Sequence, residues 1–254
     1  YEISLGLVGS EMCIRDRSDV HGFFKPMKAA LNEAGFENGN PEHKLVVCGD
    51  LLDRGPQAKE MVAYMRDCPN KILIRGNHED LFEECCDRQE FWSHDISNGT
   101  ADTICQLVGK DDPFNIDEKD FIKAHAIFSV LLDQMVDYYE TENYIFVHGW
   151  IPDVGDYKDF YGIDWRNYPA NGRAWKDARW RNGMLAAATG DIVKDKTIVS
   201  GHWHCSWGHA TFDEDSPPEW GSDAVFTPYY SKGIIAIDAC TAYSGFVNCL
   251  VLED

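Results

Sequence analysis

Clusters of Asp, His and Asn recur along the chain at spacings that suit metal binding. They are Asp19-x-His21-Gly22, Gly49-Asp50-x-x-Asp53-Arg54-Gly55, Gly76-Asn77-His78-Glu79, and the isolated His148 and His202. Carboxylate and amide oxygens mixed with imidazoles suit Mn, Fe or Zn better than a thiolate site does. Asp19 and His21 have the two-residue spacing of a strand, which would point both side chains to one side and toward one ion. We expect Asp50 to bridge this ion to a second.

The residues around these clusters predict hydrolysis of a phosphate ester. Two ions about 3.5 to 4 Å apart can hold a hydroxide at neutral pH and stabilise both oxygens of an in-line displacement at phosphorus. His78 follows the candidate ligand Asn77, so we expect it beside the ions, protonating the leaving alkoxide. Asp53 would hydrogen-bond that imidazole, fix its tautomer and raise its pKa. Arg54 offers a forked donor for phosphate oxygens.

Each cluster taken alone also has an ordinary structural explanation. A Gly-Asp pair is often a turn, Asn-His a loop end, and Asp-Arg a surface ion pair. Three such motifs in one chain, with two further histidines, favour the functional interpretation.

The elements that must position these residues are short apolar runs. Each is rich in Val, Ile and Leu, as in buried strands. The runs are 45–48 before Gly49-Asp50, 72–74 before Arg75-Gly76-Asn77-His78, 144–147 before His148-Gly149, and 197–199 before Ser200-Gly201-His202-Trp203-His204. Open α/β sheets place their sites at the carboxyl ends of strands, so we expect these side chains to converge.

Helical patterns separate the apolar runs. They cover residues 23–34, 57–66 after Pro56, and 121–139 after Asp117 as N-cap. Intervals of about 25 to 30 residues between the strand ends fit βαβ crossovers. Residues 234–237 and 246–252 indicate two more strands, joined by a turn at Ser244-Gly245, which we expect to form a hairpin on the sheet edge.

Composition limits the class of protein. The chain has 254 residues, 44% of them hydrophobic and 26% charged, which predicts one large domain with its own core. A formal net charge of −20 argues against unaided binding to nucleic acid or to an anionic membrane, and suits a bound cation. No run approaches the roughly 20 apolar residues of a membrane-spanning helix. Nine cysteines without a CxxC pair argue against a disulfide framework, and no secretory signal is evident, so we expect the cytoplasm.

The motifs resemble those of the metallophosphoesterase (calcineurin-like) superfamily, and within it the phosphoprotein phosphatase group, which includes phage and bacterial serine/threonine phosphatases. The resemblance is carried by Ser-Asp-Val-His-Gly at 18–22, Gly-Asp-Leu-Leu-Asp-Arg-Gly at 49–55 and Gly-Asn-His-Glu at 76–79. It implies an α/β fold in which a two-sheet β-sandwich is flanked by helices. It also implies the ligand sets: Asp19, His21 and Asp50 for the first ion, and Asp50, Asn77, His148 and His202 for the second.

Three segments depart from the group's pattern. Ser18 replaces the usual Gly, and His148-Gly149-Trp150 lacks the group's second Gly, which predicts a bulkier loop near the second ion. Gly201-His202-Trp203-His204 resembles the Gly-His-x-His motif of the wider superfamily, in which the second His binds the first ion. We therefore expect His204 to be a ligand; the alternative is a hydrogen bond at the rim.

A second phosphate-binding arginine is implied between the two late histidine motifs. Arg179 is our choice, with Arg173 and Arg181 as alternatives. The interval from 150 to 180 also carries a set of aromatic residues, namely Tyr157, Phe160, Tyr161, Trp165 and Tyr168. These would form a substrate-facing cap or, as we favour, pack a long loop onto the body.

The stretch before Asp19 is anomalous. Residues 14–18 place Arg15, Asp16 and Arg17 where a central apolar strand should run. Unpaired buried charges cost several kcal/mol each. We hypothesise that residues 1–17, which look like translated sequencing-adapter read-through, are not native, and that 18–254 form a single domain. The alternative is an unusual edge strand.

Together these observations predict a dinuclear metal-dependent phosphomonoesterase, with Mn as the expected metal and Fe or Zn as alternatives. A serine/threonine protein phosphatase is the first expectation, with direct attack of a bridging hydroxide on phosphorus, and with a phosphorylated protein or small phosphoester as substrate. Hydrolysis of dinucleoside polyphosphates or another phosphodiester is the second. A catalytically silent binding module ranks last, because every expected ligand and the acid are present. The sequence does not indicate which oligomeric state the protein has.

Overall fold

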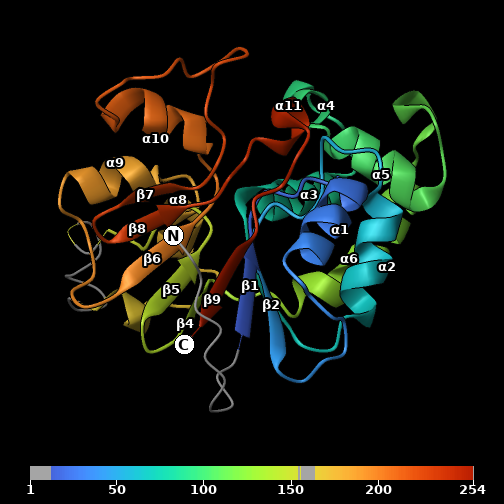
Figure 1. Cartoon of the computed structure of the whole chain (residues 1–254). Coiled ribbons are helices and arrows are strands. Elements are labelled where there is room, and N and C mark those ends of the chain that lie inside the picture. Colours follow the sequence, from blue (N-terminus) through green and yellow to red (C-terminus); the bar gives the residue numbers. More distant parts are fainter. Residues whose placement is uncertain (1–12, 154, 156–163, 254) are drawn as a thin grey trace.

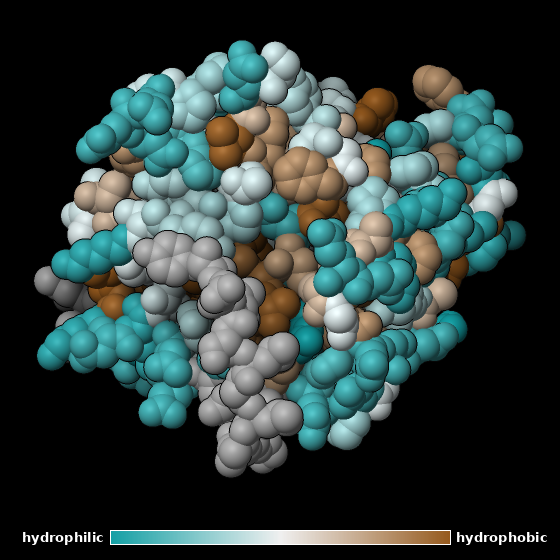
Figure 2. Space-filling model, viewed as in Figure 1, coloured by the Kyte–Doolittle hydropathy of each residue, from teal (hydrophilic) through white to brown (hydrophobic). Residues whose placement is uncertain are grey.

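Two β-sheets lie face to face between two groups of helices (Figure 1). This computed structural model describes residues 13–153, 155 and 164–253. Hydrophilic side chains gather toward both sides of the face shown in Figure 2, and hydrophobic ones show near its centre.

The first sheet has the strand order β3-β2-β1-β9. Its first three strands in the chain are parallel, and β9 runs antiparallel to β1. The strands are β1 (Cys13–Arg17), β2 (His43–Cys48), β3 (Lys71–Ile74) and β9 (Leu250–Glu253).

The second sheet has the order β4-β5-β6-β8-β7. Its three inner strands are parallel, and both edge strands are antiparallel to their neighbours. The strands are β4 (Tyr138–Glu140), β5 (Tyr144–Val147), β6 (Thr197–Ser200), β7 (Tyr229–Ser231) and β8 (Ile234–Ala236).

Helices cover the outer face of each sheet (Figure 1). The first sheet packs against α1 (Phe24–Glu33), α2 (Ala58–Asp67), α3 (Asn77–Arg88), α5 (Thr100–Val108) and α6 (Glu118–Leu132). The second packs against α8 (Arg173–Ala178), α9 (Gly183–Ala188) and α10 (Cys205–Phe212). Short helices complete the described chain: α4 (Ser93–Asn98), η1 (Pro113–Asn115), η2 (Trp165–Asn167) and α11 (Thr241–Ser244). None of the helices in the described ranges has the length and apolar character to cross a bilayer.

Three buried clusters follow from the alternation of side chains along the strands. In β2, Leu45 and Val47 face the helices, whereas Val46 and Cys48 face the second sheet. Successive strand residues point to opposite faces, so a strand covered on both sides reads as a continuous apolar run. This is why the predicted runs were recognisable as buried strands.

The expected strands that end at the candidate metal ligands are confirmed. The expected helices are also present, and the first two start one residue, and the third three residues, from the expected position. Asp117 caps α6 by accepting hydrogen bonds from Lys119 N and Asp120 N. The predicted helix 121–139 was too long, because α6 ends at Leu132 and Tyr138–Glu140 forms β4.

The predicted C-terminal hairpin was wrong. β8 pairs with β6 and β7 in the second sheet, whereas β9 pairs with β1 in the first. The connecting segment crosses between the sheets, and Val247 and Leu250 bury their side chains in two different clusters. Patterns of apolar residues predict where strands lie but not which strands pair, because tertiary packing decides the pairing.

Strand β1 occupies the middle of the first sheet, between β2 and β9, so the alternative of an edge strand was wrong. Ile14 packs between the sheets, and Arg15 donates to the carbonyls of Ala34 and Cys13. Asp16 is fully buried, and the Cys48 thiol lies 3.3 Å from its Oδ1. Charges therefore do enter the interior here. The non-native origin of residues 1–17 stays a prediction, and residues 1–12 lie outside the described ranges.

Replacing Asp16 by Val should stabilise the protein. A valine on this inner face avoids the desolvation of a carboxylate, and the free energy of unfolding should rise by about 1 to 3 kcal/mol. Urea denaturation followed by circular dichroism measures it. Ile14→Ala, on the same face of the same strand, is the control and should lower that free energy by about 2 to 5 kcal/mol. A destabilised Asp16→Val variant would show that the carboxylate contributes to stability.

Candidate active site

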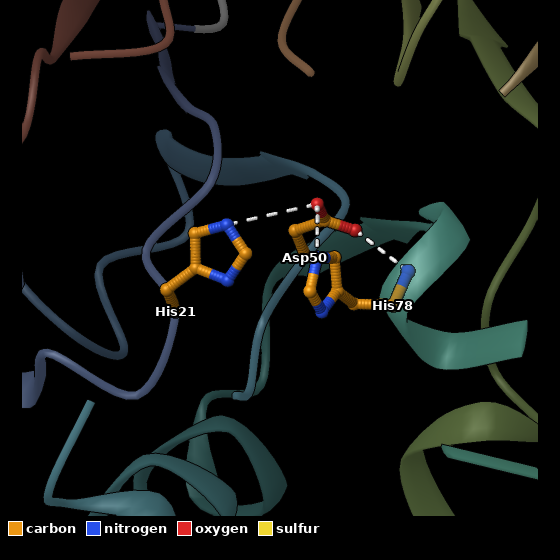
Figure 3. Close-up of side chains that lie close together, drawn as sticks. All are labelled: His21, Asp50 and His78. Atoms are coloured by element: carbon orange, nitrogen blue, oxygen red, sulfur yellow. Dashed lines mark hydrogen bonds and ion pairs between the residues drawn. The ribbon is translucent and has the colours of Figure 1, made fainter. Parts of the chain in front are cut away.

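The loops after five parallel strands bring the predicted residues together. Figure 3 shows Asp50 between His21 and His78, which come from the loop after β1 and the start of α3. His148 follows β5 and His202 follows β6. The strand ends therefore converge as the sequence predicted.

Asp19 and His21 reach the site by a different route from the one expected. β1 ends at Arg17, and both residues lie in a loop with positive φ, 48° for Asp19 and 46° for His21. Their side chains still approach each other, with His21 Nε2 4.0 Å from Asp19 Oδ2. The strand geometry predicted for this pair was wrong, but the pairing itself is present.

The carboxylate of Asp50 faces imidazoles on both sides. Its Oδ2 lies 3.7 Å from His21 Nε2, and its Oδ1 lies 3.4 Å from His148 Nε2. Asp50 therefore belongs to two groups of donor atoms, one with His21 and His78 and one with His148 and His202. A carboxylate shared in this way is suited to bridging two ions.

The Nδ1 atoms of two site histidines face backbone carbonyl oxygens, which fixes the orientation of the rings. His21 Nδ1 lies 3.0 Å from Leu52 O, and His148 Nδ1 lies 2.8 Å from Cys48 O. When Nδ1 donates its proton to the carbonyl, Nε2 keeps its lone pair for a metal. Both Nε2 atoms face Asp50.

Asn77 completes a set of converging acceptors. Its Oδ1 lies 2.7 Å from His148 Nε2, next to Asp50 Oδ1. With the His148 proton on Nδ1, none of these three atoms carries a hydrogen to share. Acceptors gathered this closely fit a cation between them.

Burial and mutual charge set the protonation of the donor set. The pKa of Asp19 is raised by burial, by Asp238 and by Asp50. Burial alone would raise the pKa of Asp50. The neighbouring histidines, His148 first, lower it by more, so the net shift is downward. Burial lowers the pKa of His21, His148 and His202, that of His202 to about 3. The imidazoles are therefore neutral at pH 7, as metal ligands must be.

These residues fit two divalent cations. Asp19, His21 and Asp50 would hold one, and Asp50, Asn77, His148 and His202 would hold the other. Asp19 belongs to neither of the two close donor groups around Asp50 and approaches the first of them through His21, at 4.0 Å. Buried carboxylates are costly unless paired or bound to metal, and a pair of cations neutralises this cluster.

His78 is held beside this cluster by Asp53. Its Nδ1 lies 2.8 Å from Asp53 Oδ2. Burial lowers the pKa of His78, but the charge of Asp50 and the hydrogen bond to Asp53 outweigh burial, so the pKa is raised. Arg54 lies across both imidazoles, with Nη1 3.0 Å from His21 Nε2 and Nη2 3.1 Å from His78 Nε2. The expected acid, its orienting carboxylate and a forked donor are therefore together.

Arg179 does not make the expected contacts. It is buried, and its Nη atoms donate to Asp80 Oδ2 and Asp137 Oδ1, both at 2.5 Å. Its charge reaches the site only indirectly, as one cause of the lowered pKa of His148. This conformation gives Arg179 a structural role, and its phosphate-binding role stays a prediction.

The two alternative arginines are also engaged elsewhere. The Arg173 side chain is 87% exposed and lies near Asp177. Arg181 donates to Ile151 O and to Asp191 Oδ2. Among the candidates, Arg54 is the arginine that contacts the site histidines.

His204 lies at the rim. Its Nδ1 is 2.9 Å from Ser206 Oγ, and its Nε2 is 3.3 Å from Glu219 Oε1. The ring also caps α10 by accepting from Trp207 N, and both donor groups around Asp50 form without it. The expectation that His204 binds the first ion is not met in this conformation, because the start of α10 holds the ring; the rim alternative fits better.

The loop after His148 is less crowded than expected. The Trp150 side chain is 1% exposed, packs into the core of the second sheet, and donates from Nε1 to Asp191 O. Its bulk therefore points away from the donor set. Trp165 and Tyr168 are buried in the same core, as in the favoured packing interpretation. Tyr157, Phe160 and Tyr161 lie outside the described residues.

Sequence reasoning missed Asp238 and assigned no role to Glu79. Asp238 follows β8 directly after Ile237, and its pKa is raised to about 7, by burial first. Asp238 directly follows the apolar run 234–237, so the same argument that found the other site residues at strand ends would have found it. Glu79 accepts hydrogen bonds from the backbone of Asp50, Leu51 and Gly76, so it holds the loops after β2 and β3 together.

Comparison with known proteins agrees with this geometry. A profile of calcineurin-like phosphoesterases matches residues 18–223. The asymmetrical bis(5'-nucleosyl)-tetraphosphatase PrpE of Bacillus subtilis is 37% identical over 70 residues, 24% of this chain and 29% of that protein. The match thus spans less than a third of that relative. Serine/threonine-protein phosphatase 1 of Salmonella typhimurium is 24% identical over 192 residues, 75% of each chain.

Among solved structures, the cold-active protein-tyrosine phosphatase of a psychrophilic Shewanella species superposes with a TM-score of 0.51 and 15% identity. That alignment covers 96% of this chain and 76% of the other. It shows a shared fold.

Two histidines two residues apart allow a direct test of the ligand set. His202→Ala should lower bound Mn from two ions to about one per chain, because His202 belongs to a donor group with Asp50 and His148. His204→Ala should keep both ions. Metal analysis of dialysed protein by mass spectrometry measures the content. A His204→Ala variant that loses an ion would restore His204 as a ligand, and a His202→Ala variant that keeps both would remove His202.

Proposed function

The chain belongs to the calcineurin-like phosphoesterase family, and from this premise we propose that it is a metal-dependent phosphomonoesterase acting as a serine/threonine protein phosphatase. The observation that carries the proposal is the His78–Asp53 pair beside a carboxylate that faces two sets of imidazoles. Serine/threonine-protein phosphatase 1 of Salmonella typhimurium aligns over 75% of both chains, which supports this choice. A symmetrical bis(5'-nucleosyl)-tetraphosphatase of Erwinia tasmaniensis, 22% identical, aligns over 93% of this chain and 92% of its own, which supports the second candidate below.

The metals would supply the nucleophile and part of the charge neutralisation. When bound, two divalent cations, Mn in our proposal with Fe or Zn as alternatives, activate water and stabilise phosphoryl oxygens. Arg54 would bind further phosphoryl oxygens through its fork, which already spans His21 and His78. A substrate oxyanion would replace the imidazoles as its acceptor.

His78 would complete the reaction as general acid. Its Nδ1 is held by Asp53, which leaves Nε2 facing the site. As the bond between phosphorus and the leaving oxygen breaks, a proton on Nε2 would pass to that oxygen. The raised pKa of His78 favours the protonated form that this step needs.

A second candidate substrate is a dinucleoside polyphosphate. Exposed aromatic rings lie near the site: Trp180 is 53% exposed with its ring 5.7 Å from that of His202. Trp220 and Tyr243 are 48% and 54% exposed, and their rings are 5.2 Å apart. Aromatic faces of this kind can stack nucleobases. The similarity to the tetraphosphatase of Bacillus subtilis also supports this candidate.

The proposed location is the cytoplasm. All nine cysteines are free thiols, which is typical of proteins kept in a reducing compartment.

A substrate panel on Mn-loaded protein separates the two candidates. We expect kcat/KM for a phosphothreonine peptide to exceed that for a dinucleoside tetraphosphate at least about tenfold, a difference of about 1.4 kcal/mol in activation free energy. The reverse ratio would favour the second candidate. Absence of turnover with every phosphoester, at full metal loading, would contradict the enzymatic proposal.

His78→Asn should lower kcat by about 10²- to 10⁴-fold, the usual contribution of a general acid. Its metal content should stay near two ions per chain, because the expected ligands remain. Steady-state kinetics and metal analysis measure both quantities. His125→Asn, the same change on α6, is the matched control and should be fully active. Full activity of His78→Asn would remove His78 from the mechanism.

A further inference from the structure

Helix α5 contacts Asp53 at two points, although it lies far from the catalytic motifs in the sequence. Thr100 Oγ1 donates to Asp53 Oδ2 at 2.7 Å, and Thr103 Oγ1 accepts from Asp53 N at 3.0 Å. Both threonines are fully buried. The first turn of α5 therefore holds both the side chain and the backbone of Asp53.

The oxygen that Thr100 contacts is the one that orients His78. Asp53 Oδ2 accepts from Thr100 Oγ1 and from His78 Nδ1, the latter at 2.8 Å. The other oxygen, Oδ1, is buried and has no hydrogen-bond partner within the described part of the chain. Two donors on one oxygen therefore fix the rotation of this carboxylate. One is His78, the partner of Asp53 in the proposed proton transfer, and the other is Thr100.

The approach of α5 to Asp53 depends on the residue before Thr100. Gly99 has φ 87°, and a Cβ at this position would lie 2.4 Å from Arg54 N. The junction of α4 and α5 thus packs directly on the backbone of the Asp53–Arg54 loop. Asp53 and Arg54 themselves have positive φ, 71° and 62°, so this loop is one that surrounding contacts must hold.

We propose that Thr100 is a positioning residue for the proton-donating pair. Its hydroxyl fixes the Asp53 carboxylate, and the carboxylate in turn fixes the His78 ring with Nε2 toward the leaving group. This inference rests on the proposed function, since it requires His78 to protonate the leaving oxygen. Loss of the hydroxyl leaves the Asp53 carboxylate held by His78 alone and free to rotate, while Thr103 still holds the backbone.

The leaving group provides a readout that a merely structural role would not move. Phenolate is a much stronger base than p-nitrophenolate, so phenyl phosphate depends more on protonation of the leaving oxygen than p-nitrophenyl phosphate does. A misplaced His78 should slow the first substrate more than the second. KM should change little, because Arg54 and the metal ligands are unaltered.

The experiment compares Thr100→Val, which removes the hydroxyl at nearly constant shape, with Thr100→Ser, which keeps it. Both are assayed as Mn-loaded full chain. Thr100→Val should lower kcat on phenyl phosphate about three- to tenfold more than kcat on p-nitrophenyl phosphate, the size expected for one hydrogen bond. Thr100→Ser should restore the ratio. Thr189→Val, the same change at the C-cap of α9, is the control and should leave the ratio unaltered.

The outcomes separate this inference from the function on which it rests. Equal effects of Thr100→Val on both substrates, or no effect, would overturn the role of Thr100 while the phosphatase remains. A wild-type protein that hydrolyses neither ester with its metals bound would instead overturn the proposed function. If Thr100→Val does not fold, Thr100→Ala measured in the same way decides the question.

Discussion

The carboxylate of Asp50 is the constraint on which the rest of the site depends. It is 2% exposed, and its two oxygens face the Nε2 atoms of His21 and His148. Asp19 and Asp238 lie in the same interior, and burial raises the pKa of both, which means that ionising them there is costly. Backbone N–H groups of His78 and His202 donate to Asp50 and Asp19, but several carboxylates buried this close together still repel one another when ionised. Two cations would neutralise this arrangement, so the electrostatics of the site support the proposed metal requirement.

The scaffold exists to hold that unfavourable cluster in place. The loop of Asp50 is tied to the loop of Asn77 by Glu79, which accepts the backbone N–H groups of Asp50, Leu51 and Gly76. Gly76 lets the loops touch, since a Cβ there would lie 2.2 Å from Asp50 Oδ1. The second sheet then brings His148 against Cys48 O from the opposite side. Ligands from both sheets meet because each sheet ends its parallel strands at the same edge.

Much of this could be predicted from the sequence, because buried parallel strands are continuous apolar runs and their ends carry Asp50, Asn77, His148 and His202. The rest depends on tertiary contacts that no local pattern encodes. Strand β9 pairs with β1, from which it is 240 positions away at the widest pair, Cys13 with Glu253, rather than with its neighbour β8. Arg179 donates to Asp80 and Asp137 and so turns away from the site. The ring of His204 caps α10, and the carboxylate of Asp53 accepts from Thr100.

The anomalous strand β1 bears on the two metal positions unequally. Asp16 lies in the inter-sheet core, and two residues later Ser18 contacts Asp19 and Cys48 O at the edge of the site. Strain or displacement of β1 would therefore reach Asp19 and His21 through three or fewer residues. The further ligands of the second position follow β3, which β2 separates from β1, and β5 and β6, which belong to the other sheet. The inner residues of these strands still share one cluster with Ile14 of β1. A displaced β1 would thus disturb the first position most directly and would reach the second through Asp19 Oδ1, which accepts from His202 N. The shared Asp50 would remain anchored by Glu79.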